Sequence, residues 1–124
     1  MIAADTSALS CYFRGDRNRE TDLVHEAFRS GEIALPPVVL TEMLSDPQAQ
    51  RQMLETVAEF YLLPVLEGYW ARAGNARRML MQKRLKPKVA DALIAQSCID
   101  HDVALIQRDH DFRHFARHCG LKLA

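Results

Sequence analysis

The chain has 124 residues, of which 48% are hydrophobic and 26% charged, and 16 basic residues balance 16 acidic ones. These values exclude a disordered chain, a fibrous protein and a uniformly polycationic nucleic-acid binder, and they favour a single domain over residues 1–124. No apolar stretch is long enough to cross a bilayer and no signal-peptide pattern opens the chain, so we expect a cytoplasmic protein without membrane contact.

Short apolar segments alternate with amphipathic ones along the chain. The apolar segments predict strands over residues 1–4, 33–35, 61–65, 103–107 and 121–123. Apolar side chains spaced three and four residues apart predict helices over residues 20–29, 48–60, 67–85, from 89 onward, and 112–118. Strands and helices that alternate through connections this short indicate an α/β fold, with a parallel sheet covered on both faces. Pro64 places residues 61–65 near an edge of that sheet.

An acidic residue begins the apolar face of the helix predicted from residue 89. Asp91 shares this face with Ile94 and Cys98. A lone buried charge is costly, so the Asp91 carboxylate must be neutralised, hydrogen-bonded or bound to a cation. The strand that follows this helix ends near Asp109, at the carboxyl edge where open α/β sheets gather their ligands.

Two further acids occupy comparable positions. Asp5 ends the opening strand, and we expect Thr6 or Ser7 to cap the helix that follows, although Asp5 could itself be a plain N-cap. Pro36-Pro37 opens another helix, on which Glu42 lies one turn after Val38. We therefore expect Glu42 to face inward as Asp91 does.

Together these acids predict a metal site. In a parallel sheet, strand ends and inward helix faces can converge on one crevice. Carboxylates packed closely cannot all stay ionised without a cation, and oxygen ligands suit Mg²⁺ or Mn²⁺ rather than zinc. Such a site can activate water and stabilise a phosphoryl oxygen without a histidine base. The prediction depends on four acids jointly, namely Asp5, Glu42, Asp91 and Asp109.

At these positions the sequence resembles the PIN-domain ribonucleases, and most closely the VapC-type toxins of VapBC toxin–antitoxin pairs. The shared segments span essentially the whole chain: DTSAL at 5–9, PPVVLTE ending at Glu42, VADALIAQ around Asp91 and RDHDF at 108–112. The resemblance implies a three-layer α/β/α sandwich with a short, mainly parallel central sheet. It also implies a metal-dependent endoribonuclease, the toxin of a type II pair, which hydrolyses RNA phosphodiesters with a metal-activated water.

The resemblance also implies roles for individual residues. A catalytic, metal-binding role with one or two Mg²⁺ or Mn²⁺ ions falls to Asp5, Glu42, Asp91 and Asp109, with Asp111 as an extra or outer ligand. Thr6 or Ser7 matches a supporting hydroxyl. Gln107 departs from the family, which often has Thr or Ser two residues before the fourth acid, so the outer shell is expected to differ here.

Basic residues form two clusters in an otherwise neutral chain. Residues 77–88 hold six basic residues and no acid, and three arginines lie within residues 14–19. Either cluster alone could be a solvated face. If the substrate is RNA, candidates for contact with its backbone are Arg14, Arg17, Lys86, Lys88 and Arg108.

The resemblance implies protein partners as well. An antitoxin of this kind lays an amphipathic segment along an apolar groove and reaches a cation into the acidic pocket. The helix predicted over residues 48–60, with Phe60 and Tyr61 at its end, could supply such a groove. We also expect a twofold homodimer, whose interface the sequence does not assign.

Other readings remain open at this point. His110, His114 and His118 are spaced to line one side of a helix and could bind zinc, although three cysteines without a CxxC pair do not form a thiolate zinc site. A phosphoacceptor receiver domain also places acids at strand ends. A third reading is a protein of the PIN fold that binds or processes RNA without a toxin role, or a non-catalytic binding module.

Overall fold

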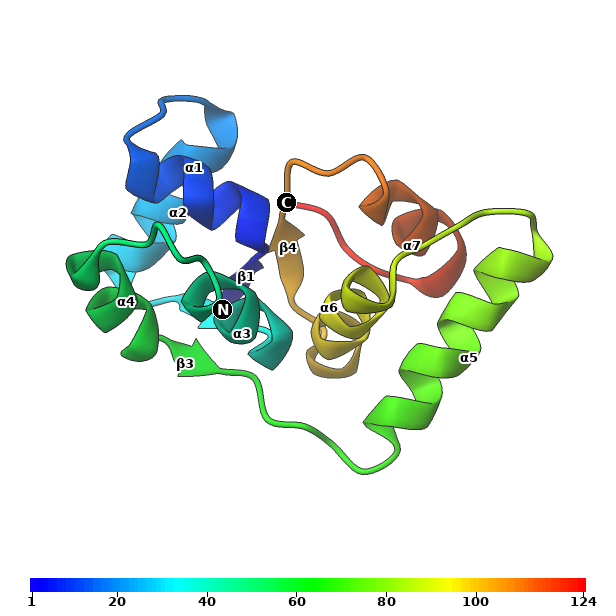
Figure 1. Cartoon of the computed structure of the whole chain (residues 1–124). Helices are drawn as coiled ribbons and strands as arrows, with labels where there is room; N and C mark the ends of the chain where they lie inside the picture. Colours follow the sequence, from blue (N-terminus) through cyan, green and yellow to red (C-terminus); the bar gives the residue numbers. More distant parts are fainter.

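The computed structural model describes residues 1–124 and shows four short parallel strands in one sheet (Figure 1). Their order is β3-β2-β1-β4. In the central strand β1, Ile2 pairs with Ile33 on one side and with Ala104 on the other. The strands are β1 (Ile2–Ala4), β2 (Ile33–Leu35), β3 (Tyr61–Leu62) and β4 (Ala104–Ile106). As predicted, β3 lies at an edge, whereas residues 121–123 make only an isolated bridge from Leu123 to Leu105.

Seven helices connect and cover the strands. Figure 1 shows α1 and α2 on one side of the sheet and α5, α6 and α7 on the other. The prediction of an α/β fold with helices flanking a parallel sheet is therefore confirmed. The helices are α1 (Thr6–Arg14), α2 (Arg19–Ser30), α3 (Pro37–Leu44), α4 (Arg51–Ala58), α5 (Tyr69–Gln82), α6 (Val89–His101) and α7 (Phe112–Cys119). None of them has both the length and the apolar character needed to cross a membrane.

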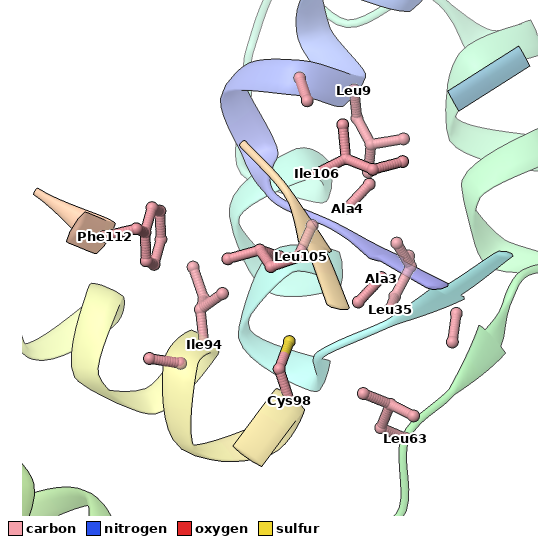
Figure 2. Packing of buried hydrophobic residues seen from close by; sticks show 14 of the residues in the cluster. Ala3, Ala4, Leu9, Leu35, Leu63, Ile94, Cys98, Leu105, Ile106 and Phe112 are labelled. Atoms are coloured by element: carbon pink, nitrogen blue, oxygen red, sulfur yellow. The ribbon is translucent and has the colours of Figure 1, made fainter. Parts of the chain in front are cut away.

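The neighbouring strands β1 and β4 are buried on both faces. Successive residues of a strand point to opposite faces, and in β4 both Leu105 and Ile106 are almost fully buried. Figure 2 shows Ile106 directed toward Leu9 of α1 and Leu105 directed toward Ile94 of α6. The core therefore continues through the sheet, and the small β1 residues allow helices to approach closely from either side.

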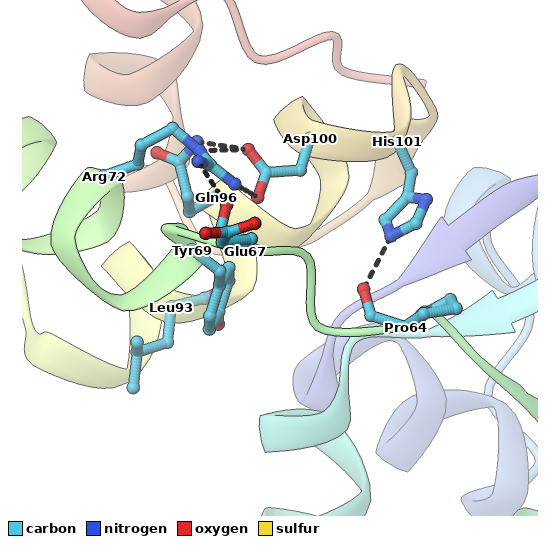
Figure 3. Close-up of polar contacts among 8 residues, drawn as sticks. All are labelled: Pro64, Glu67, Tyr69, Arg72, Leu93, Gln96, Asp100 and His101. Carbon is cyan, nitrogen blue, oxygen red and sulfur yellow. Dashed lines mark hydrogen bonds and ion pairs between the residues drawn. The ribbon is translucent and has the colours of Figure 1, made fainter.

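A polar network fixes α5 against α6 (Figure 3). Arg72 donates two hydrogen bonds to the Asp100 carboxylate, at 3.0 and 2.7 Å, and Gln96 donates a third at 2.8 Å. The Tyr69 hydroxyl donates to the carbonyl of Leu93 at 2.6 Å. Because α6 carries Asp91, this network also sets the position of that acid in the fold.

Two helices are shorter than their patterns predicted. The prediction over 48–60 overstated α4, because the backbone N–H of Gln48 bonds to the Asp46 carboxylate in a turn before the helix begins. The prediction over 67–85 overstated α5, because Gly68 adopts a left-handed conformation before its first residue. At the other end, Arg84 has a φ of 64°, which stops the helix after Gln82.

Candidate metal centre

Three aspartates bring their carboxylates together at the carboxyl edge of the sheet. One oxygen from each of Asp91, Asp109 and Asp111 lies within 4.8 Å of the other two. Asp91 belongs to the first turn of α6, whereas the other two lie in the turn between β4 and α7. Oδ1 of Asp109 accepts a 2.9 Å hydrogen bond from the backbone N–H of Asp111, which holds that turn in shape.

Asp91 is buried on the apolar face where its spacing placed it. Its exposed fraction is 8%, and Ile94 and Cys98 on the same face are 2% or less exposed. Its Oδ2 atom is buried and has no hydrogen-bond partner. Burial and then the charge of Asp109 together raise the pKa of Asp91 to about 6, although Lys88 opposes the shift.

Asp5 directly follows β1 and is itself the N-cap of α1. Oδ1 accepts a 2.8 Å hydrogen bond from the backbone N–H of Ala8, and the Ser7 hydroxyl donates to both carboxylate oxygens. The expectation that Thr6 or Ser7 caps the helix was wrong, because Asp5 is the last residue with extended backbone. Burial, with smaller contributions from the charges of Asp109 and Glu42, raises the pKa of Asp5 to about 6 despite these hydrogen bonds.

Glu42 lies beside this group but is not buried. The prediction that it faces inward was wrong, because Val39 and Met43 occupy the buried side of α3 and Glu42 lies about 100° around the helix from Met43. Its side chain is instead oriented by Thr6, whose hydroxyl donates a 2.6 Å hydrogen bond to Oε1.

The five predicted acids thus form one electrostatic group. Asp5 responds to Asp109 and Glu42, and Asp91 responds to Asp109, Asp111 and Glu42. An unpartnered buried carboxylate oxygen beside two further carboxylates is a donor set that fits a hard divalent cation such as Mg²⁺ or Mn²⁺. Which of these acids are direct ligands stays a prediction.

Comparison with known proteins identifies the family. The PIN domain family model matches residues 2–118. This chain belongs to the PIN domain family. The receiver-domain reading is therefore wrong. The crystal structure of VapBC2 from Rickettsia felis bound to a DNA fragment from their promoter contains a chain that is similar in fold, with a TM-score of 0.77. The two chains are 20% identical, and the match covers 100% of this PIN domain and 98% of that chain. No curated protein matches this sequence.

The histidines of the PIN domain do not form the zinc site that their spacing suggested. No group of three metal-binding side chains in the structure includes a histidine. The reason is that α7 begins only at Phe112, so His110 precedes the helix and does not continue the side on which His114 and His118 lie. The zinc reading is not supported.

The predicted RNA-binding residues occupy different settings around the acids. Lys88 lies close enough to Asp91 to affect its titration. Arg14 is held by Asp16, with a nitrogen–oxygen distance of 2.6 Å, and Arg108 also acts on the Asp16 carboxylate. Arg17 and Lys86 are exposed and form no ion pair. Their contact with RNA stays a prediction.

Sequence reasoning missed two features of this region. One is the ion pair of Arg14 with Asp16, which their separation by a single residue could have suggested. The other is a set of cations on α7, where Arg113 and Arg117 lie one turn apart. Their spacing is present in the sequence, but the same segment was interpreted only through its histidines, as candidate zinc ligands.

Proposed function

We propose that this PIN domain is a divalent-metal-dependent endoribonuclease that hydrolyses RNA phosphodiesters, and that it is the toxin of a type II toxin–antitoxin pair. The observation that carries the proposal is the cluster of carboxylates formed by Asp91, Asp109 and Asp111. Within this cluster the Oδ2 atom of Asp91 is buried and has no hydrogen-bond partner. Carboxylates in this arrangement repel one another at neutral pH unless a cation joins them. Membership of the PIN family and the fold shared with a chain of a VapBC2 structure support the same function.

In this proposal Asp91, Asp109 and Asp111 hold one or two Mg²⁺ or Mn²⁺ ions, with Asp5 and Glu42 completing the site. When bound, the metal supplies Lewis acidity toward a phosphoryl oxygen and makes water more acidic. The chain's own contribution is orientation. The Ala8 N–H and the Ser7 hydroxyl fix the Asp5 carboxylate, and Thr6 fixes Glu42. These bonds keep the carboxylates in place before the substrate arrives.

RNA has to approach a site that is itself acidic. Lys88 caps the start of α6, and its charge favours the ionised form of Asp91. Lys88 and the exposed cations Arg17, Lys86 and Arg108 would counter the repulsion between the acids and the phosphates, with Arg14 available if it exchanges its partner Asp16. Their role in the proposal is to hold the RNA backbone.

A groove between α1, α2 and α4 offers a place for an antitoxin segment. It has a volume of about 810 Å³, and its apolar lining includes Tyr12, Phe13, Phe28 and Met53. Met53 of α4 lines this groove, whereas Phe60 and Tyr61 line a separate, adjoining hollow. We propose that an amphipathic helix of the antitoxin occupies the groove. We also propose that the protein forms a homodimer, and no surface is assigned to its interface.

Cleavage of RNA by the purified protein tests the proposal. Mixed single-stranded RNA is incubated with the wild type in Mg²⁺, in Mn²⁺ and in chelator, together with Asp91→Asn and the control Asp22→Asn, which changes an exposed acid of α2. We expect cleavage in metal alone, a loss of at least about 100-fold in Asp91→Asn and no loss in the control.

A separate measurement distinguishes an inactive binding module from a nuclease whose substrate is absent. Mn²⁺ should raise the melting temperature of the wild type through linkage, and should raise that of Asp91→Asn much less. Absence of both cleavage and a metal-dependent rise would contradict the nuclease function. A rise without cleavage of any RNA would favour the non-catalytic alternative.

A further inference from the structure

Helix α7 carries four basic side chains and no acid. Phe112 and Phe115 are buried and fix the inner side of the helix. On the outside, Arg113 and Arg117 are exposed one turn apart, and His114 and His118 form a second pair at the same spacing. Like charges one turn apart destabilise a helix, and the dipole favours only the cations of the last turn. The helix thus presents positive charge that its own sequence does not neutralise.

Helix α5 adds to this positive charge. It packs against α7, and Figure 1 shows its C-terminal end beside that helix. The pKa of His118 lies below its ordinary value, first because of burial and then because of the charges of Lys83, Arg117 and His114. All the charges that act on His118 are therefore positive. Because they help to lower its pKa, the His118 ring is mainly neutral at pH 7, and the lysine and arginine side chains supply the positive charge of this surface. We call this surface the α7 basic face, and it consists of Lys83, Arg84, Arg113, His114, Arg117 and His118.

None of the five ion pairs in the structure involves the α7 basic face. Elsewhere, Arg14, Arg51 and Lys122 pair with a nearby carboxylate, whereas other exposed cations such as Arg17 and Lys86 do not. The α7 basic face is therefore distinguished by the clustering of its unpaired cations on one surface. The chain as a whole has no excess of positive charge. Uncompensated cations on one face of a neutral protein indicate an anionic partner from outside the chain.

Arg84 adds a further cation just beyond the C-terminal end of α5. It follows the C-cap of α5 and has a φ of 64°, in the left-handed region that disfavours residues with a Cβ atom. Glycine occupies this kind of conformation after α1 and α2. An arginine in this position carries backbone strain that glycine would not, as does Asp102 after α6, and its side chain adds a positive charge at this end of α5.

The α7 basic face adjoins the metal centre. Helix α7 starts at the residue after Asp111, and its eight residues extend for about 12 Å. We propose that the α7 basic face binds the sugar–phosphate backbone of RNA on one side of the scissile phosphodiester. This inference rests on the proposed function, because it describes the path of the RNA backbone away from the metal centre where cleavage is proposed. An RNA strand fits better than an acidic protein because the row of cations begins at a centre suited to phosphate chemistry.

Binding of RNA in chelator tests the inference without cleavage. The probe is a short fluorescein-labelled oligouridylate, and affinity is measured over a series of salt concentrations. The test variant is Arg113→Gln/Arg117→Gln, and the matched control is Arg29→Gln/Arg51→Gln, which removes two exposed charges from α2 and α4. We expect the test variant to lower the slope of log K against log salt by about 1.4, at about 0.7 for each phosphate contact, and the control to leave it unchanged.

Arg84→Gly separates charge from stability. This substitution removes a cation and relieves the left-handed strain, so the melting temperature should stay the same or rise while RNA affinity falls. Equal effects of the test and control pairs on RNA affinity would overturn the inference. A larger loss for fluorescein-labelled polyglutamate than for RNA would also overturn it, because the face would then recognise an acidic protein.

Cleavage of RNA in Mn²⁺ tests the α7 basic face separately from the proposed nuclease function. If the wild type cuts RNA and the Arg113→Gln/Arg117→Gln variant cuts and binds as the control does, the inference fails and the proposed function stands. If the wild type cuts no RNA but the test variant alone loses RNA binding, the proposed nuclease function fails and the α7 basic face stands as an RNA-binding surface.

Discussion

The hydroxyl of Thr6 donates a 2.6 Å hydrogen bond to Oε1 of Glu42 and thereby joins the first residue of α1 to an exposed acid of α3. Thr6 directly follows Asp5, so the same bond keeps Glu42 near the buried carboxylate whose pKa it raises. An exposed glutamate would otherwise sample several rotamers. The interaction explains how Glu42 can belong to the metal centre without being buried.

Replacing Thr6 by Val should weaken metal binding while preserving the fold. Valine keeps the branched shape but cannot orient Glu42, and loss of such an outer hydrogen bond typically lowers metal affinity by about 10-fold or more. Isothermal titration with Mn²⁺ measures the change. Ser10→Ala is the matched control, because Ser10 lies one turn later on α1 and donates to the sulfur of Met43, the neighbour of Glu42. Equal affinities for the two variants would show that Thr6 does not position a ligand.

Stability of the metal-free protein should rise as pH falls through about 6. The pKa values of Asp5 and Asp91 are both about 6 in the folded state, above the ordinary 3.8, so the folded protein binds protons that the unfolded chain releases. Ionisation of the pair should lower the free energy of unfolding by about 2 kcal/mol between pH 4.5 and 7.5. Urea denaturation in chelator measures this loss.

Asp91→Asn is the control for that pH dependence. The amide does not ionise, so its stability should depend less on pH over the same range. His118 acts in the opposite direction, because its lowered pKa destabilises the fold as pH falls, but this effect is present in both proteins and cancels in their difference. Saturating Mn²⁺ should reverse the wild-type trend, since metal binds the ionised carboxylates. Parallel pH profiles for wild type and Asp91→Asn would contradict the assignment.

Periodicity was sufficient to place Asp91 and Asp109 in the fold. Asp91 occupies the position that its spacing from Ile94 and Cys98 required, and Asp109 follows a strand as its sequence context indicated. Both predictions depend on local geometry, which sequence spacing determines directly. The parallel sheet flanked by helices could be predicted from the alternation of strands and helices, and the edge position of β3 from Pro64. The order of the other strands was not predicted, and the family resemblance depended on motif residues and not on periodicity.

Glu42 and His110 show where local patterns were insufficient. Glu42 shares a turn with apolar residues, but packing selected Val39 and Met43 for the buried side of α3, and no spacing rule distinguishes those choices. The histidine pattern failed because its spacing requires all three histidines on one helix, whereas α7 begins at Phe112 and leaves His110 in the preceding turn. The bond between Thr6 and Glu42 joins residues 36 apart in the sequence, so it could not be predicted before the fold was known.

Removing the carboxylate of Asp100 should destabilise the fold strongly. Its side chain is 6% exposed and accepts three hydrogen bonds, two from Arg72 and one from Gln96 (Figure 3). Asp100→Ala leaves these donors unpaired, at a cost of about 2 to 3 kcal/mol in the free energy of unfolding. Chemical denaturation measures it, and Asp102→Ala is the control, because Asp102 makes its ion pair with Lys122 at the exposed surface.

The Asp100 contribution should have the opposite pH dependence from that of Asp5 and Asp91. The Arg72 guanidinium holds the pKa of Asp100 below its ordinary value. The stabilisation is therefore present above the unfolded pKa of about 3.8 and is lost as pH falls below it. The difference in unfolding free energy between wild type and Asp100→Ala should shrink below about pH 4. A difference that stays constant to low pH would show that packing, and not charge, accounts for the loss.

Two glycines on either side of the start of α5 should respond to alanine in opposite directions. Gly68 has a φ of 83°, and a Cβ atom there would lie 2.6 Å from Nη1 of Arg72. Gly68→Ala should therefore lower the free energy of unfolding by about 1 to 2 kcal/mol, from backbone strain and displacement of Arg72 from Asp100. Gly74 lies inside α5 with no atom within 4 Å of its Cβ position, so Gly74→Ala should raise stability by about 0.5 to 1 kcal/mol. Urea denaturation of both variants measures the pair, and destabilisation of equal size at both sites would show that the Arg72 contact does not set the cost at Gly68.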